Sequence, residues 1–235
     1  MRRCVQAVLG AISVCVVIVG AGCSRQEEPA APTPTPSRPV TPPHITEAPP
    51  QPLPTETGKV VDSNMTLEQA LSGKDIPRDI ERNLVLVDVD YWSFDGREHR
   101  GQLVIHKDLA EEVKAIFADI KKARFPIEKM APVSKYAWSD EASMEDNNSS
   151  SFNYRSVQGW RRLSVHAYGR AIDINPRLNP YVKDGVSLPA GAVYSPEVLG
   201  SITQYGPVVE AFRKRGWKWG GSWRKLKDWQ HFEKA

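Results

Sequence analysis

The alternation of apolar and polar residues predicts two strands near the start of the globular part of the chain. Between positions 84 and 91, apolar side chains alternate with others that include Asp88 and Asp90, which is the period of two typical of a half-buried strand. Phe94-Asp95-Gly96 then supplies a turn, and Leu103-Val104-Ile105 is a candidate partner strand. We therefore expect two paired strands joined by a short connection.

A period of three to four residues predicts two helices. Apolar residues between Leu109 and Ile120 are spaced by four, three, one and three positions, so they share one helical stripe. Asp108 precedes this stripe, and Glu111 stands where a capping box places its acidic residue, so the predicted helix covers about 108–123. Gly206-Pro207 opens a second helix, which Gly216 ends.

Shorter patterns complete the prediction of the fold. They indicate strands near 133–138, 171–174, 217–219 and 229–232, and a short amphipathic helix between Met65 and Leu71. Helices and short strands that do not alternate as βαβ units indicate an α+β fold. We expect a compact single domain over residues 59–235, with a small, mostly antiparallel sheet flanked by helices.

The first 22 residues have the features of a signal peptide. Arg2 and Arg3 precede a mostly apolar run of about fifteen residues, which is shorter than the roughly 20 that a spanning helix needs. The run ends in Gly20-Ala21-Gly22-Cys23, which resembles the lipobox of bacterial lipoproteins. This resemblance implies cleavage before Cys23 and lipidation of that cysteine. Ordinary signal cleavage and an uncleaved anchor are the alternatives.

Residues 23–58 are predicted to form an extended tether after the lipidated cysteine. Eleven prolines lie between Pro29 and Pro54, interleaved with Thr, Ala and Ser. Proline fixes φ and removes a backbone donor, so this stretch forms neither a helix nor a central strand. About thirty such residues span up to roughly 90 Å, which is enough to hold a domain away from a bilayer.

Composition and charge narrow the classes of function. The 235 residues are 40% apolar and 25% charged, as in ordinary globular proteins, and the formal net charge is +3. The sequence has no basic stripe, and we therefore expect no nucleic-acid partner. All three cysteines lie within the first 23 residues, which excludes a disulfide framework, a thiolate metal site and a cysteine nucleophile from the folded part.

Two histidines and one aspartate are candidates for metal binding. Asp173 stands between Ile172 and Ile174 in a strand-like run that follows His166, so its carboxylate faces away from two apolar neighbours. A buried carboxylate needs a cation or a metal as partner. His231 lies four residues from the C-terminus. Two imidazoles and one carboxylate suit Zn²⁺, but the spacing alone favours ordinary structural roles for all three.

The wider pattern closely resembles the zinc-binding signature of the M15 family of peptidoglycan peptidases. The pattern is Ser164-x-His166-x-x-Gly169-x-Ala171-x-Asp173, followed by Asp228-x-x-His231. The likeness covers roughly residues 85–235. The family includes D-alanyl-D-alanine carboxypeptidases, D,D-dipeptidases and L-alanyl-D-glutamate endopeptidases, and its fold is shared with Hedgehog proteins. Aspartate three residues before the last histidine makes the endopeptidase-like branch the nearer match.

The resemblance implies a role for each matched position. His166, Asp173 and His231 would bind Zn²⁺, and Asp228 would be the general base. Arg155 matches the arginine that holds the substrate carbonyl or the developing oxyanion, with a surface ion pair as its alternative. Ser164 would contact the substrate or support a metal ligand, with a turn hydroxyl as its alternative.

Other conspicuous residues are assigned structural roles. His44 lies in the proline tract and is expected to be exposed, His99 is predicted in a surface turn, and His106 is predicted to be structural at a strand end. Trp217, Trp219, Trp223 and Trp229 crowd around the predicted site strand. We expect most of these rings in the core and one or two beside the cleft.

The resemblance and the leader together predict a zinc-dependent peptidase of the cell envelope. Its expected substrates are peptidoglycan stem peptides, and its lipid anchor at Cys23 is its expected contact with the membrane. Ser24 follows Cys23 where aspartate would signal inner-membrane retention, so outer-membrane sorting is favoured in a Gram-negative cell. We expect a monomer. The alternative is a non-catalytic, peptidoglycan-binding envelope lipoprotein that keeps the fold without turnover.

Overall fold

The computed structural model describes residues 58–157 and 159–234. The predicted signal peptide, Cys23, His44 and nearly all of the tether lie outside the described residues. The helices are α1 (Leu67–Leu71), α2 (Arg78–Glu81), α3 (Ala110–Lys122), α4 (Asp140–Glu145) and α5 (Pro207–Arg213), and the short 3-10 helices are η1 (Lys107–Leu109), η2 (Val133–Tyr136), η3 (Val165–Tyr168) and η4 (Gly220–Ser222). The strands are β1 (Val60–Val61), β2 (Leu84–Trp92), β3 (Glu98–His106), β4 (Lys129–Met130), β5 (Asn148–Ser149), β6 (Ala171–Asp173), β7 (Tyr181–Lys183), β8 (Val186–Leu188), β9 (Lys218–Trp219), β10 (Lys227–Asp228) and β11 (His231–Glu233).

The predicted pair of strands forms a long antiparallel hairpin. β2 and β3 are in register from Leu84 opposite His106 to Trp92 opposite Glu98. The alternation seen in the sequence directs Val87, Val89 and Tyr91 into the core. β1 joins the free edge of β3 in parallel. The N-terminal end of the described chain is thereby tied to the hairpin.

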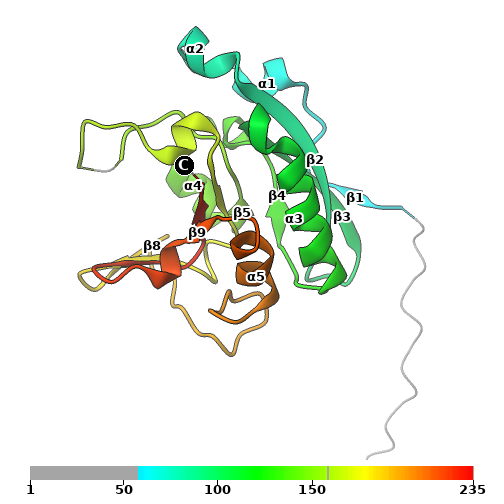
Figure 1. Ribbon diagram of the computed structural model, residues 1–235, viewed down its shortest axis with the longest axis vertical. Coiled ribbons are helices and arrows are strands. Elements are labelled where there is room, and N and C mark those ends of the chain that lie inside the picture. The colour runs from blue at the N-terminus through cyan, green and yellow to red at the C-terminus, as the bar shows by residue number, and fades with distance from the viewer. Residues whose placement is uncertain (1–57, 158, 235) are drawn as a thin grey trace, which may run out of the picture. The chain divides into compact units, whose positions relative to one another are not determined.

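Both predicted helices are present and pack against one core. α3 covers the β2–β3 hairpin and contacts α5 (Figure 1). Val113, Ile116 and Ile120 are fully buried, as their helical spacing predicts. The expected capping box is wrong, because Glu111 instead pairs with Lys114 at 2.7 Å. The turn before the helix is η1, which begins where the His106 imidazole accepts the Asp108 N–H.

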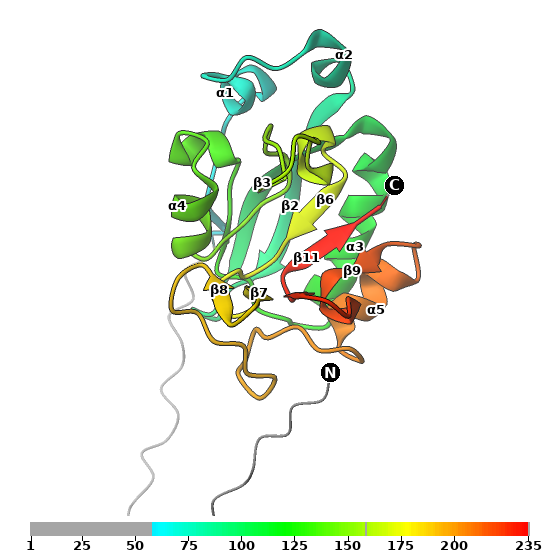
Figure 2. The same ribbon diagram turned by 90° about the vertical axis from the view of Figure 1, so that its left-hand side faces the viewer.

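The C-terminal strands form a second sheet that shares this core. β11 lies between β6 and β9 and pairs antiparallel with both, as Figure 2 shows. β7 pairs antiparallel with β8 and β10, whereas β4 and β5 pair in parallel. The described residues belong to one compact unit, and the predicted α+β class is confirmed. The strands form several small sheets, where one was expected.

Several local predictions are wrong, each for a physical reason. The strand expected near 133–138 is the 3-10 helix η2, which ends because Ala137 has a left-handed φ of +50°. His99 is not in a surface turn. It lies in β3, 8% exposed, with Nδ1 at 3.0 Å from Asp62 Oδ1 and Nε2 at 3.1 Å from Asp95 Oδ2. Two carboxylates satisfy both ring nitrogens, which makes its burial tolerable.

The short helix expected between Met65 and Leu71 is confirmed as α1. Its capping box is formed by Thr66 and Gln69 rather than by an acidic residue. Within the described ranges, none of the helices has the length and apolar character that a bilayer-spanning segment needs.

Candidate metal centre

Two paired strands bring the candidate aspartate and the second candidate histidine together. In the antiparallel register of β6 and β11, Asp173 lies directly opposite His231, and Ile172 lies opposite Phe232. Side chains alternate across a strand, so burying Ile172 and Phe232 in the core turns Asp173 and His231 to the other face. The apolar pattern of these short strands therefore positions two polar groups next to each other.

A 3-10 turn presents the first histidine to this pair. Ser164 is the N-cap of η3, where its Oγ accepts the His166 backbone N–H at 3.3 Å. Gly169 ends η3 with a φ of +63°, and a Cβ there would lie 2.7 Å from the His106 backbone nitrogen. Only glycine satisfies both the left-handed conformation and this close approach. The turn holds His166 over β6.

The three candidate ligands converge on one point. His166 Nε2 lies 3.1 Å from His231 Nδ1. The two Asp173 carboxylate oxygens lie 3.2 Å from His166 Nε2 and 2.9 Å from His231 Nδ1. Donor atoms around a tetrahedral Zn²⁺, at about 2.0–2.1 Å from the ion, are separated by about 3.3 Å. The spacing and chemistry of this donor set therefore fit zinc, and the three residues form a buried group able to hold a metal ion.

Each imidazole has a partner for the nitrogen that faces away from this point. His166 Nδ1 donates to the Ser151 carbonyl oxygen at 2.5 Å. His231 Nε2 lies 3.4 Å from Glu233 Oε2. When a metal is bound, these contacts would keep the protons on the outer nitrogens, so that Nε2 of His166 and Nδ1 of His231 would present lone pairs to the ion.

The electrostatics of the cluster favour an ionised carboxylate. Burial raises the pKa of Asp173, but the adjacent imidazoles of His166 and His231 outweigh burial and hold this pKa well below its usual range. Burial lowers the pKa of His231, but the hydrogen bonds to Asp173 and Glu233 outweigh burial and raise it. A cation is therefore strongly favoured beside Asp173.

Asp228 lies in β10, at the end of a separate small sheet, where it pairs with Tyr181 of β7. Its Oδ1 is buried and has no hydrogen-bond partner among the described residues. Burial, together with the negative charge of Asp173, raises the pKa of Asp228 to about 7. Gly220 permits this arrangement, because a Cβ at that position would lie 2.6 Å from the Asp228 carbonyl oxygen.

Arg155 extends towards the same region from the segment before η3. One guanidinium nitrogen makes an ion pair with Asp140 at 2.9 Å, so the surface ion pair considered from the sequence is present. Its Nε, however, is buried without a hydrogen-bond partner. The charge of Arg155 also lowers the pKa of Asp228, which means that the two groups lie within electrostatic reach of each other.

Comparison with known protein families adds an independent observation. Residues 158–234 match a family model of M15 peptidases described as D-alanyl-D-alanine carboxypeptidase. This match supports the resemblance to M15 peptidases that the sequence motifs indicate. No curated protein and no solved structure gave a match.

The segment matched to the M15 peptidases contains most of the site. Ser164, His166, Asp173, Asp228 and His231 lie inside it, and Arg155 lies just before it. Ser164 contacts the backbone of His166, which corresponds to the supporting or turn role among the sequence-based alternatives.

The tryptophans divide as the sequence predicts. Trp217 and Trp219 are buried in the core. The Trp223 ring lies 5.4 Å from the His231 ring and thus borders the candidate metal centre. Trp229 stacks on Tyr194 with 3.9 Å between ring centroids, which supports the segment between Asp228 and His231.

Sequence reasoning missed three residues that support the site. Glu233 could have been found, because a residue two positions after His231 in a strand shares its face. Asp140, which orients Arg155, has no sequence signal because α4 is distant along the chain. Ser151 contributes only a backbone carbonyl to His166, and a carbonyl is independent of residue type.

Proposed function

We propose that this protein is a zinc-dependent peptidase that hydrolyses amide bonds in peptidoglycan stem peptides. The reaction would be of the D-alanyl-D-alanine carboxypeptidase or the L-alanyl-D-glutamate endopeptidase type. The observation that carries the proposal is the convergence of His166, Asp173 and His231 near Asp228, whose Oδ1 is buried without a hydrogen-bond partner among the described residues. A purely structural cluster has no need for the unpaired carboxylate.

His166 Nε2, Asp173 and His231 Nδ1 would hold the zinc ion. When bound, Zn²⁺ supplies a Lewis acid that polarises a substrate carbonyl and acidifies a water molecule. Three protein ligands are the number found in catalytic zinc sites, which keep a position for water or substrate.

Asp228 is suited to move the proton in amide hydrolysis. Its carboxylate would accept a proton from water as the oxygen attacks the carbonyl carbon, and would return that proton to the leaving amine as the C–N bond breaks. Burial raises the pKa of Asp228, which makes its carboxylate a better proton acceptor than an exposed aspartate.

Arg155 is suited to stabilise the charge that develops on the carbonyl oxygen. Its ion pair with Asp140 fixes the guanidinium plane, and its buried Nε has no acceptor among the described residues. A pre-oriented donor with a fixed charge favours the tetrahedral transition state over the planar amide.

The proposed setting is the cell envelope, with a lipid anchor at Cys23. The lipobox-like sequence before Cys23 and the proline-rich tether support this setting. A long extended tether would let the peptidase reach cell-wall peptides away from the membrane surface.

Incubation of the full-length protein with purified sacculi tests the proposal. We expect released peptides, and mass spectrometry of the products identifies which bond is cut. The matched control is Asp228→Asn, which keeps the shape and the metal ligands and should release at least a hundredfold less peptide. Zinc chelation should abolish release, and added zinc should restore it. Co-sedimentation with sacculi without any release would instead identify the non-catalytic wall-binding protein.

A further inference from the structure

Two projecting arms begin at the residues of the site. The first arm consists of residues 156–157 and 159–163, and a bridge between Ser156 and Leu163 closes it. Its base is fixed by the Ser164 N–H, which donates to the Arg155 carbonyl oxygen at 3.0 Å. The arm therefore joins Arg155 directly to the turn that holds His166.

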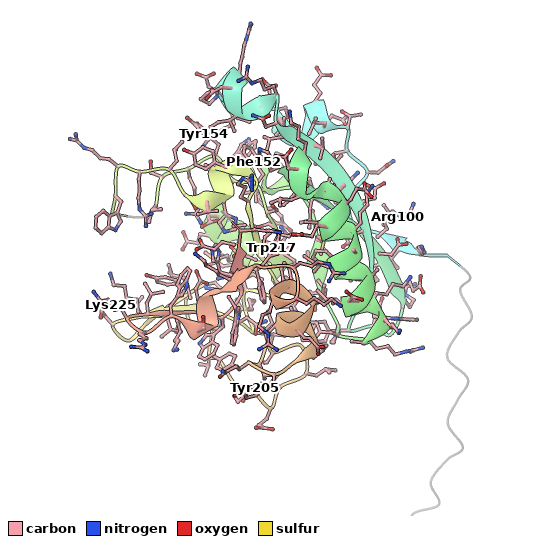
Figure 3. The ribbon with its side chains drawn as sticks, in the orientation of Figure 1. Arg100, Phe152, Tyr154, Tyr205, Trp217 and Lys225 are labelled. Atoms are coloured by element: carbon pink, nitrogen blue, oxygen red, sulfur yellow. The ribbon has the colours of Figure 1, made fainter. Side chains whose placement is uncertain are left out.

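The second arm consists of segments 181–188 and 222–228. Its hairpin is the pair β7–β8, and β10 adds to the edge of β7. In the 222–228 segment, Trp223 lies near the start, where its ring borders His231, and Asp228 is the last residue. Both arms project to the same side in Figure 1, with β11 between them, and Figure 3 shows Lys225 at the end of the second arm.

The two arms concentrate positive charge that the sequence distributes over distant positions. The cationic side chains on the two arms are Arg161, Arg162, Lys183, Arg224, Lys225 and Lys227. Apart from Asp228 in the site, the only acidic residue on these segments is Asp184. The whole chain has a net charge of only +3, so the site is flanked by a local excess of positive charge.

Most of these cationic side chains do not contribute an ion pair or a hydrogen bond to the described part of the fold. The side chains of Arg161, Arg162, Arg224 and Lys225 are solvent-accessible and make no ion pair or hydrogen bond with the described residues. Lys227, in contrast, donates to the Gly221 carbonyl oxygen at 2.9 Å. Charges that add nothing to the fold and surround a site raise the local concentration of an oppositely charged substrate.

The first arm also exposes a large ring. Trp160 is 69% exposed at the tip of this arm, where folding gains little from its apolar surface. An exposed tryptophan beside two unpaired arginines has the composition of a ligand-contact surface rather than of a structural turn.

We propose that the two arms bind acidic peptides by their carboxylates, on both sides of the bond to be cut. This inference rests on the proposed function and adds the substrate charge that the site selects. The first arm would hold carboxylates on one side of the scissile amide through Arg161 and Arg162. The second would hold carboxylates on the other side through Arg224 and Lys225.

The distribution of charge favours a peptide over a polyanion such as nucleic acid. The cations form two separate groups, one on each arm, and the site where the arms begin carries the carboxylates of Asp173 and Asp228. A phosphodiester chain carries charge at every unit and gains most from a continuous basic stripe. A peptide with a neutral amide between acidic groups matches a pattern of positive arms around a centre that is near neutral once a divalent ion is bound.

The test compares two stem peptides with the zinc-loaded, full-length protein. One peptide has free carboxylates on both sides of the cleavable bond, and the other has the same carboxylates amidated. Arg161→Glu with Arg162→Glu, or Arg224→Glu with Lys225→Glu, should raise KM for the acidic peptide about tenfold while kcat stays unchanged. The amidated peptide should be almost unaffected. Added salt should weaken binding of the acidic peptide to the wild type and have much less effect on the charge-reversed variants.

Two control variants separate charge from other effects. Lys122→Glu with Arg213→Glu reverses two exposed cations on α3 and α5, away from the arms, and should leave KM for both peptides unchanged. Trp160→Ala should raise KM for the acidic and the amidated peptide by the same factor, because the indole carries no charge.

Calorimetric titration with the same two peptides provides a readout that does not require turnover. Tighter binding of the acidic peptide, lost in the charge-reversed variants, would support the arms even if no peptide were cleaved. Binding of this kind without any cleavage would refute the proposed reaction but keep the proposed ligand. Equal affinity for the two peptides would overturn the inference. Preferential binding of a short DNA duplex or of polyphosphate, lost in the same variants, would overturn it in favour of a polyanion partner.

Discussion

The candidate site has two regions that the fold supports in opposite ways. One is the metal-ligand cluster of His166, Asp173 and His231, and the other consists of the two residues Asp228 and Arg155, here called the pair. In the cluster, His166 and His231 each have an outer nitrogen held by Ser151 or Glu233. In the pair, Asp228 Oδ1 and Arg155 Nε are both buried, and neither has a hydrogen-bond partner in the part of the chain that the structure describes. The fold thus supplies partners to the groups that would bind an ion, and it leaves one buried polar atom without a partner in each of the two groups that would act on a substrate.

This difference gives the two regions different relations to stability. A buried polar atom without a hydrogen bond costs about 1–3 kcal/mol, so the Asp228–Arg155 pair weakens the fold unless substrate or water compensates. The ligand cluster is instead stabilised by any metal that binds the native state alone. Substitutions in the cluster should remove metal and activity together, whereas substitutions in the pair should remove activity and leave the metal bound.

The largest expected effect comes from breaking the cluster. His166→Ala removes one of three ligands, and we expect zinc affinity to fall by at least a thousandfold and hydrolysis to become undetectable. Metal content after dialysis, and calorimetric titration with zinc, measure the affinity. Circular dichroism should show an intact fold, because His166 lies in a short turn outside the hydrophobic core. A His166→Ala protein that keeps stoichiometric zinc and full turnover would contradict the assignment of the cluster.

Arg155→Ala is expected to have the next largest effect, and it tests the region formed by Asp228 and Arg155. The loss of a charged donor should lower kcat about a hundredfold, with KM changed far less. Zinc affinity should stay within a factor of two, since Arg155 contacts none of the metal ligands. Arg155→Lys is the matched variant. It keeps the charge and loses the planar fork, so it should recover only part of the activity. A loss of zinc in either variant would mean that the two regions are not separable.

The fold was predictable where the apolar pattern extends over many residues. The alternation over β2 and the stripe over α3 each involve several core side chains, so a change of register would expose all of them. The prediction failed at η2 and at His99. At η2 a left-handed residue decides the backbone, and at His99 two carboxylates from other segments permit burial. Neither cause is visible in the local sequence.

The residues of the candidate site could be named from the sequence, but their geometry could not. His166, Asp173 and His231 were selected by resemblance, because residues 58 and 65 positions apart do not reveal that two strands and a turn meet. Glu233 follows from strand alternation once β11 is accepted. The burial of Asp228 Oδ1 and Arg155 Nε without partners, and the gathering of cations on the two arms, arise only in the tertiary structure. The sequence shows no basic stripe because these cations are far apart along the chain.

Glu233→Gln tests whether the support of the cluster matters in itself. Glutamine keeps the size of the side chain and removes the negative charge that faces His231 Nε2. We expect zinc affinity to fall about tenfold, as for other residues that orient a metal ligand. Activity measured at saturating zinc should change less than twofold. Calorimetric titration with zinc measures the first effect, and an unchanged dissociation constant would show that the 3.4 Å contact is too weak to position the ring.

The smallest expected effect is on stability, and it concerns Asp228 in the zinc-free protein. Its folded pKa of about 7 is above the roughly 3.9 of an unfolded aspartate, owing first to burial and then to the charge of Asp173. Between pH 4 and pH 7 the unfolded chain loses this proton before the folded chain does, so stability falls as pH rises. Above pH 7 the carboxylate is charged in both states and the full penalty is present.

Asp228→Asn removes this penalty, so the variant should be the more stable protein at high pH. We expect equal melting temperatures near pH 4 and an advantage for the variant above pH 7 of about 2–4 °C, which corresponds to roughly 1 kcal/mol for a domain of this size. Thermal unfolding with chelator present, measured from pH 4 to pH 8, follows the difference. A variant that melts lower than the wild type at pH 8 would mean that the Asp228 carboxylate has a stabilising partner. Asp228 would then belong with the satisfied groups of the cluster, and the contrast between the two regions would be lost.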